Sequence, residues 1–221
     1  ALGSSSFSPA EMVRAYSILA NPEDSKDLFF IERIEDRNGK IIFQNPQVEN
    51  MKRNIDAFPW FQTQLKEEIQ PFYLLPSIKR KSLGLIDPRV TFITKDILRE
   101  ALARGSNGNK TKVLNRRDIA GKTGTTNDAV STWFSGFHND LVTTVWVGTD
   151  DFSSLGDNEF GSTIALPAWV DFMKIALDTL PEEDWKIPKG LSYVRVDRES
   201  GRPVDESSKN SYFELFLDED A

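Results

Sequence analysis

The chain has 221 residues, of which 39 % are hydrophobic and 11 % aromatic, so it has enough apolar material for one large domain or two small ones. That composition argues against a disordered chain. Its 27 basic and 34 acidic side chains give a net charge of −7, which argues against nucleic acid as a partner because an acidic protein repels phosphate.

The spacing of apolar residues predicts a mixture of helices and strands. In chain order we expect a helix over 10–20, a hairpin of 28–36 with 41–44, a helix over 87–104, strands over 117–126, 132–137 and 141–148, a helix over 166–180 and a strand over 191–196. Strands with helices on both sides in the sequence indicate an α+β fold, with an antiparallel sheet flanked by helices.

Turn and cap residues mark where these elements begin and end. Ser8 is expected to cap the first helix, and Asn38-Gly39 to supply the positive φ of a type I′ turn in the hairpin. Residues 45–86 are expected to be irregular with short helices, and 106–112 to form a loop. The residues of the last long helix that are expected to pack on the sheet are Trp169, Phe172, Met173 and 175–177.

Few side chains offer metal or thiol chemistry. The chain has no cysteine, which excludes thiol catalysis and is compatible with an oxidising compartment. Its single histidine, His138, lies in an expected turn and is predicted to be exposed; we expect neither a metal site nor a cofactor. The acidic residues 218–220 are predicted to be a solvated tail.

No apolar run approaches the roughly 20 residues that span a bilayer, and no signal peptide is visible. We therefore expect any membrane anchor to lie outside this sequence.

The segment Gly121-Lys122-Thr123-Gly124-Thr125-Thr126-Asn127 carries the chemistry. Alternation along a strand puts Thr123 and Thr125 on one side, where both hydroxyls can meet one anionic group. Gly124 lets a substrate backbone approach the strand, and Lys122 adds a positive charge beside it. The N–H of Thr125 is placed to stabilise an oxyanion. These residues suggest an edge strand that binds an extended peptide with a free carboxylate, although Lys-Thr-Gly alone also occurs by chance.

Residues 119–128 closely resemble the third active-site motif of class A penicillin-binding proteins. That family also has a Trp-Phe-x-Gly-Phe/Tyr block a few residues later, which is matched here by residues 133–137. Further similar stretches occur in the same order along the chain, at 1–17, 34–39, 141–148, 165–167 and 194–197. The resemblance covers most of the chain and thins between residues 45 and 85.

The resemblance implies the serine β-lactamase/transpeptidase-like fold and a D,D-transpeptidase that cross-links peptidoglycan and is acylated by β-lactams. It implies that Lys122 serves the proton network, that Thr123 and Thr125 hold the substrate carboxylate, and that the Thr125 N–H shares the oxyanion hole. Gly124 would permit close approach. The residues that would shape that end of the cleft are Thr126 and Asn127.

The implied partners are D-Ala-D-Ala stem peptides, β-lactams and the amino-terminal part of the same protein. The family also implies a periplasmic location at the inner membrane and a preceding glycosyltransferase domain. We expect residues 1–184 to belong to the transpeptidase domain and residues 185–221 to form an extension packed on it or trailing from it.

The nucleophile motif of the family, Ser-x-x-Lys, does not occur in the 221 residues. The second motif, Ser-x-Asn, occurs only as Ser208-Lys209-Asn210, after the Lys-Thr-Gly strand instead of before it, so we interpret it as a coincidence. Ser131-Thr132 stands where the family often has an acidic residue, and any role of that acid is in doubt. We therefore expect the isolated chain to be inactive, with the serine supplied from elsewhere in the polypeptide.

Three other interpretations stay open. A class A β-lactamase shares Lys-Thr-Gly, but the Thr-Thr-Asn-Asp stretch and the Trp-Phe block fit the synthase better. A non-catalytic peptide-binding or interaction module derived from the same fold is the main alternative. Residues 45–85 are also a possible docking segment for a regulatory protein, which the aromatic residues Phe58, Trp60 and Phe61 suggest.

Overall fold

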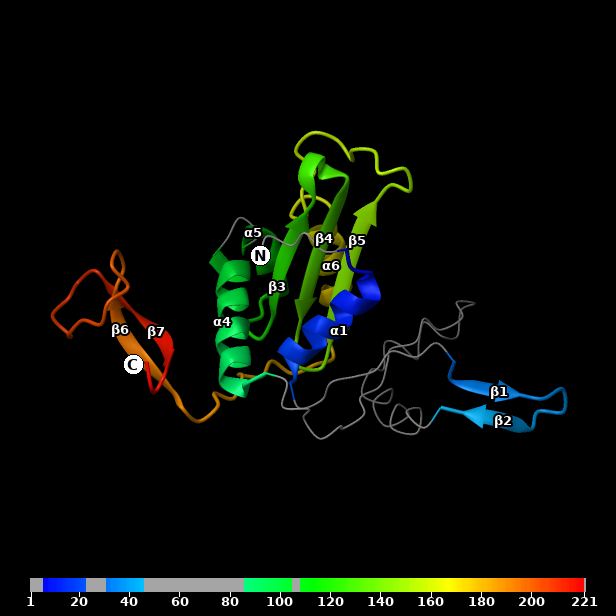
Figure 1. Cartoon of the computed structure of the whole chain (residues 1–221), viewed down its shortest axis with the longest axis horizontal. Helices are drawn as coiled ribbons and strands as arrows, with labels where there is room; N and C mark the ends of the chain where they lie inside the picture. Colours follow the sequence, from blue (N-terminus) through cyan, green and yellow to red (C-terminus); the bar gives the residue numbers. More distant parts are fainter. Residues whose placement is uncertain (1–5, 23–30, 46–85, 105–107, 221) are drawn as a thin grey trace.

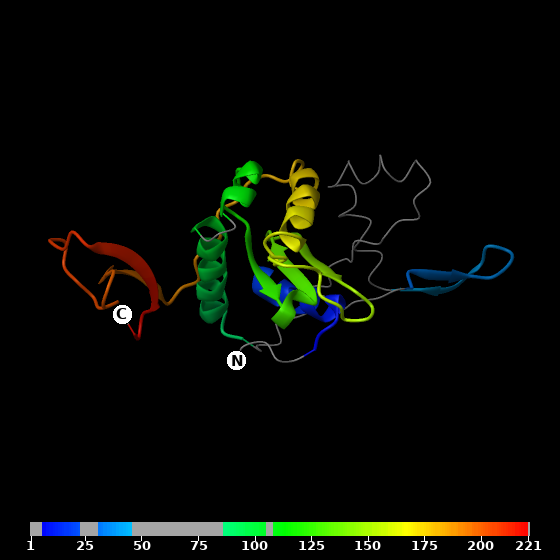
Figure 2. The same cartoon turned by 90° about the horizontal axis from the view of Figure 1, so that it is seen from above.

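The computed structural model describes residues 6–22, 31–45, 86–104 and 108–220. At its centre is a three-stranded antiparallel sheet in the order β3-β4-β5, formed by Ala120–Thr125, Ser131–Phe137 and Val142–Gly148. Helix α1 (Pro9–Ala20) lies on one face of the sheet, α6 (Ala165–Ala176) lies on the other, and α4 (Pro88–Arg104) runs beside β3 (Figures 1 and 2). The predicted α+β class is confirmed.

Two apolar clusters hold these layers together, one on each face of the sheet. Phe134 points toward α6, where its ring centroid is 4.8 Å from that of the buried Trp169. Phe137 points to the opposite face, where it packs with Ala20 at the end of α1 and Phe92 of α4. Phe134 and Phe137 are three positions apart, an odd number, so the alternation of side chains along β4 places them on different faces of the sheet.

Helix α6 is shorter than predicted, and two residues expected in the core are exposed. The helix ends at Ala176, and the chain then forms turns. Phe172 is 36 % and Ile175 55 % exposed, whereas Trp169 and Met173 are fully buried. Only the narrow stripe of α6 that faces the sheet is covered, so apolar residues beside that stripe stay in solvent.

The first helix and the first hairpin follow local signals. Ser8 and Glu11 form a capping box at the start of α1, as expected for this cap. Strands β1 (Arg33–Glu35) and β2 (Ile41–Gln44) pair antiparallel. The predicted type I′ turn is wrong, because Gly39 has a φ of +80° but Asn38 is not left-handed. Residues 37–39 form a three-residue connection closed by the Asp36 side chain, which accepts from two backbone N–H groups.

The structure corrects four further expectations. Part of the predicted loop is helical, as α5 (Gly108–Thr111) and η1 (Lys112–Leu114), and β3 starts three residues later than expected. Beyond β6 (Leu191–Asp197), a second carboxyl-terminal strand, β7 (Ser211–Leu217), pairs with it. The acidic tail is not simply solvated, because Glu219 forms an ion pair of 2.9 Å with Arg89.

Some expectations lie outside the described residues, among them the short helix over 56–69 and the start of the first hairpin strand. Within the described ranges, no helix is long and apolar enough to cross a membrane.

Lys95 of α4 is a buried cation at the junction of α1, α4 and the β4–β5 turn. Its side-chain nitrogen donates to the carbonyl oxygen of Ala20 at 3.0 Å and to Oδ1 of Asn139 at 3.1 Å, and it lies 4.3 Å from the ring centroid of Trp185. Burial, assisted by the positive charge of Arg99, lowers the pKa of Lys95 to about 8.

We expect this lysine to make stability rise with pH in the alkaline range. Its folded-state pKa lies below the ordinary 10.5, so between about pH 8 and 10.5 the unfolded chain binds the extra proton and the free energy of unfolding increases. The free energy of unfolding of the wild type minus that of Lys95→Met, measured by urea denaturation, should increase across this interval. A flat difference would contradict the lowered pKa of Lys95.

Candidate active site

The segment predicted to carry chemistry forms strand β3, at one edge of the sheet. Among the described residues, β3 pairs only with β4. The N–H of Thr126 donates to the carbonyl of Ser131 at 3.1 Å, and hydrogen-bonded pairs alternate along an antiparallel ladder. The backbone N–H and C=O groups of Thr123 and Thr125 therefore point away from β4, toward the free edge of β3, which is the edge that no described strand pairs with.

Thr123 and Thr125 share the face of the sheet that α6 covers. Thr123 lies opposite Phe134, which packs on Trp169 of that helix, and Thr125 lies opposite Thr132. The Thr125 hydroxyl accepts a hydrogen bond from the N–H of Gly161 at 3.0 Å. Thr125 is exposed and Thr123 is half-buried, so both can be reached from the edge.

Alternation along β3 places the Cβ of Lys122 on the opposite face of the sheet, but its side chain bends around the edge of the strand. Its Nζ donates to the carbonyl oxygen of Thr123 at 3.0 Å and lies 3.4 Å from the Thr123 hydroxyl. The structure thus brings together the ammonium group and a hydroxyl that alternation alone would separate. Gly124 lies between Thr123 and Thr125 along the strand, and a Cβ added there would approach Cβ of Trp133 to 3.2 Å.

The two remaining predicted residues lie in the connection from β3 to β4. The Thr126 hydroxyl donates to the carbonyl of Ser131 at 3.1 Å and accepts from the Ser131 N–H at 2.8 Å, so it closes the turn. Asn127 is exposed and begins the short helix η2 (Asn127–Ala129). Asp128 and Ala129 follow with left-handed φ angles of 58° and 50°.

Known proteins share this sequence and fold. No protein-family model matches the chain. Penicillin-binding protein 1A of Pseudomonas aeruginosa is 34 % identical over all of the chain, and that of Vibrio cholerae is 30 % identical over 98 % of it. The crystal structure of penicillin-binding protein 1A from Haemophilus influenzae superposes with a TM-score of 0.74 at 28 % identity, over 98 % of this chain.

The chain is homologous to class A penicillin-binding protein 1A. The resemblance predicted from residues 119–128 and 133–137 is therefore confirmed, and the mixed fold matches that of the transpeptidase domain. The chain spans 29 % of the Pseudomonas relative, 28 % of the Vibrio relative and 33 % of the Haemophilus chain.

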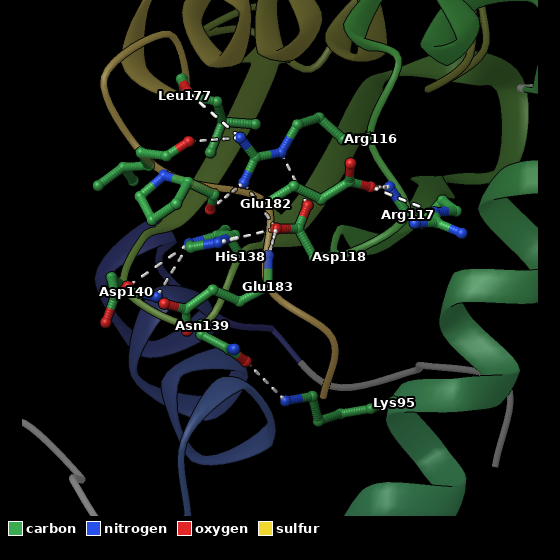
Figure 3. Close-up of polar contacts among 12 residues, drawn as sticks. Lys95, Arg116, Arg117, Asp118, His138, Asn139, Asp140, Leu177, Glu182 and Glu183 are labelled. Carbon is green, nitrogen blue, oxygen red and sulfur yellow. Dashed lines mark hydrogen bonds and ion pairs between the residues drawn. The ribbon is translucent and has the colours of Figure 1, made fainter. Parts of the chain in front are cut away.

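This penicillin-binding protein homologue contains a buried polar cluster of Arg116, Asp118 and His138 that was not predicted from the sequence. The prediction that His138 is exposed is wrong. His138 is 1 % exposed, and its Nε2 lies 3.2 Å from Oδ2 of the equally buried Asp118 (Figure 3). This contact does not have the geometry of a hydrogen bond. Arg116 contacts the same carboxylate at 2.6 and 2.8 Å, and the N–H of Glu183 donates to it at 2.9 Å.

These contacts keep the Asp118 carboxylate ionised. Burial alone would raise the pKa of Asp118, but His138, Arg116 and the Glu183 N–H together hold it well below its ordinary value. Arg116 also donates to the carbonyls of Leu180 and Pro181, so the cluster fastens the chain after α6 to the start of β3 (Figure 3).

The cluster lies at the opposite end of β3 from the candidate site. Lys122 follows Asp118 by four positions, which corresponds to about 13 Å along a strand. A cleft of about 780 Å³ opens near this end, between α4 and the 182–184 segment. Three arginines line it, and Arg99, Arg116 and Arg117 already pair with Asp96, Asp118 and Glu182, so their charge is balanced locally. The Asp118 cluster therefore supports the sheet and does not take part in the candidate site.

Proposed function

We propose that the chain is the Lys-Thr-Gly part of a D,D-transpeptidase, which cross-links peptidoglycan stem peptides by serine acyl transfer and is inhibited by β-lactams. The observation that carries the proposal is the free edge of β3, with the outward backbone of Thr123 and Thr125 and the exposed ammonium of Lys122 on it. Homology to penicillin-binding protein 1A over the whole chain supports it.

In this proposal, an extended stem peptide ending in D-Ala-D-Ala pairs with the outward backbone groups of β3. The hydroxyls of Thr123 and Thr125 bind its terminal carboxylate, and the Thr125 N–H stabilises the oxyanion. A serine from outside these 221 residues forms an ester with the penultimate residue, and the last D-alanine leaves as an amine that takes up the proton. An amine of a second stem then attacks the ester and restores the serine. The positive charge of Lys122 favours the anionic steps and assists the proton transfers.

The same proposal covers the wider protein. A membrane anchor and a glycosyltransferase domain would belong to other parts of the polypeptide, at the periplasmic face of the inner membrane. Residues 185–221 would form an extension of the transpeptidase domain, held by contacts such as the buried Leu215 and the Arg89–Glu219 ion pair. The segment suggested for a regulatory partner lies almost entirely outside the described residues.

Labelling with a fluorescent penicillin tests the proposal. We define the longer polypeptide as this chain together with the sequence that precedes it in its gene. The longer polypeptide should become covalently labelled, and the label should be lost when the serine of its Ser-x-x-Lys motif is replaced by alanine. The isolated chain should stay unlabelled because it contains no such motif.

Two results would contradict this assignment. Labelling of the isolated chain would mean that the nucleophile lies within these 221 residues. A longer polypeptide without Ser-x-x-Lys, which binds stem peptides but is not acylated, would favour the non-catalytic binding module.

A further inference from the structure

The connection between β5 and α6 rests on the end of β3 that carries the candidate site. Ser154 donates through its hydroxyl to the carbonyl of Asp128 at 2.8 Å, and the N–H of Leu155 donates to that of Ala129 at 3.0 Å. Farther along, Gly161 donates to the Thr125 hydroxyl, and its own carbonyl accepts from Leu166 of α6 at 2.8 Å. The connection therefore links the first turn of α6 to the last residue of β3.

Gly161 is a glycine because there is no room for a side chain. Its φ angle is not left-handed, so the reason is not backbone conformation. A Cβ at this position would lie 2.5 Å from the carbonyl oxygen of Trp133 and 2.7 Å from that of Gly124. Both atoms belong to the paired backbones of β4 and β3 and cannot give way, so a larger residue would push the connection off the sheet.

The contact from Gly161 determines what the Thr125 hydroxyl can do. A threonine hydroxyl has one proton to donate and two lone pairs that accept. At Thr125 a lone pair is occupied by the Gly161 N–H, and no described residue takes the proton. Thr126 is the contrasting case, because its proton goes to the Ser131 carbonyl.

Thr123 is in the same state as Thr125. Its hydroxyl faces the Lys122 ammonium at 3.4 Å, which can only donate, and no described acceptor takes its proton. The two hydroxyls on this face are thus each approached by a donor and keep a proton for a ligand. A group that only accepts, such as a carboxylate, suits them, whereas a group without negative charge suits them less.

We propose that Gly161 is a positioning residue, which orients the Thr125 hydroxyl as a donor and so sets the preference of the site for a carboxylate. This inference rests on the proposed function and adds to it a residue from a different element, outside the Lys-Thr-Gly strand.

The test compares acylation of the longer polypeptide by a penicillin and by the methyl ester of the same penicillin. The ratio of the two second-order acylation rate constants measures the preference for the carboxylate. Loss of a hydrogen bond to a charged group should lower this ratio by about tenfold in Gly161→Ala and in Thr125→Val. Thr125→Ser keeps the hydroxyl and should keep the ratio, and Ser162→Ala, in the same connection, should leave it unchanged.

The double variant separates positioning from a general structural effect. If Gly161 acts through the Thr125 hydroxyl, Gly161→Ala combined with Thr125→Val should lower the ratio no further than Thr125→Val alone. If the double variant lowers the ratio by the product of the two single effects, the inference is overturned. A ratio in Gly161→Ala equal to that of the wild type would also overturn it.

Hydrogen exchange gives a readout that does not depend on the folding of Gly161→Ala. The peptide that contains the Gly161 amide should exchange faster in Thr125→Val than in the wild type, and Thr125→Ser should retain the protection. Equal exchange in the wild type and Thr125→Val would overturn the inference. If the wild type is acylated by neither compound, the proposed function itself fails; if it is acylated with a preference that Gly161→Ala does not change, only the positioning role fails.

Discussion

Lys122→Ala should lower the rate constant for acylation of the longer polypeptide by a penicillin about 10²- to 10⁴-fold, the range typical of a positioned proton-transfer group. The substitution removes the ammonium that reaches the Thr123 carbonyl at 3.0 Å, on the free edge of β3. It also removes the positive charge that favours anionic steps beside that edge. Stopped-flow or gel-based measurement of the label over time gives the rate constant.

Two further variants define what Lys122 supplies. Lys40→Ala makes the same change at an exposed turn of the β1–β2 hairpin and should leave acylation unchanged. Lys122→Arg keeps the charge but cannot release a proton, so recovery of the rate in this variant would assign an electrostatic role. A Lys122→Ala protein that is acylated at the wild-type rate would remove Lys122 from the site.

Asp118→Ala should destabilise the fold by about 3–5 kcal/mol, the usual cost of removing one partner from a buried ion pair. The substitution leaves the guanidinium of Arg116, whose side chain is 11 % exposed, without its carboxylate. It also removes the acceptor of the Glu183 N–H and the carboxylate oxygen that lies 3.2 Å from Nε2 of His138. Urea denaturation of the longer polypeptide measures this decrease in the free energy of unfolding.

A neighbouring surface pair provides the matched control. The side chain of Arg117 is 83 % exposed and pairs with Glu182 at 3.4 Å, so Arg117→Ala should cost only about 0–1 kcal/mol. Equal losses for Asp118→Ala and Arg117→Ala would show that the buried cluster contributes no more than a surface pair.

The stabilisation by Asp118 should also depend on pH. Its folded-state pKa is held below the ordinary value, so as pH falls the unfolded chain takes up the proton first. The contribution is therefore complete above about pH 4 and is lost progressively at lower pH. The difference in unfolding free energy between the wild type and Asp118→Asn should shrink as the pH falls from 4 to 2. A difference that stays constant would contradict the lowered pKa.

The elements that the sequence predicted well depend on neighbours along the chain. The cap at Ser8, the course of α4 and the three central strands follow from residues within a few positions of one another. The Lys-Thr-Gly motif is also local, which is why the family could be inferred from residues 119–137 before the fold was known. Alternation in β3 likewise put Thr123 and Thr125 on one face, as the structure places them.

What the sequence could not supply depends on contacts between distant segments. Extending the β3–β4 register by one pair places His138 opposite Ile119, beside Asp118, and only that register reveals its burial. Gly161 meets Thr125 across 36 positions, through a connection whose course no local pattern predicts. Composition and short-range periodicity therefore determined the elements and the motif. Only the tertiary structure decided which side chains are buried and which groups meet at the end of β3, because register and packing bring together residues that the sequence keeps apart.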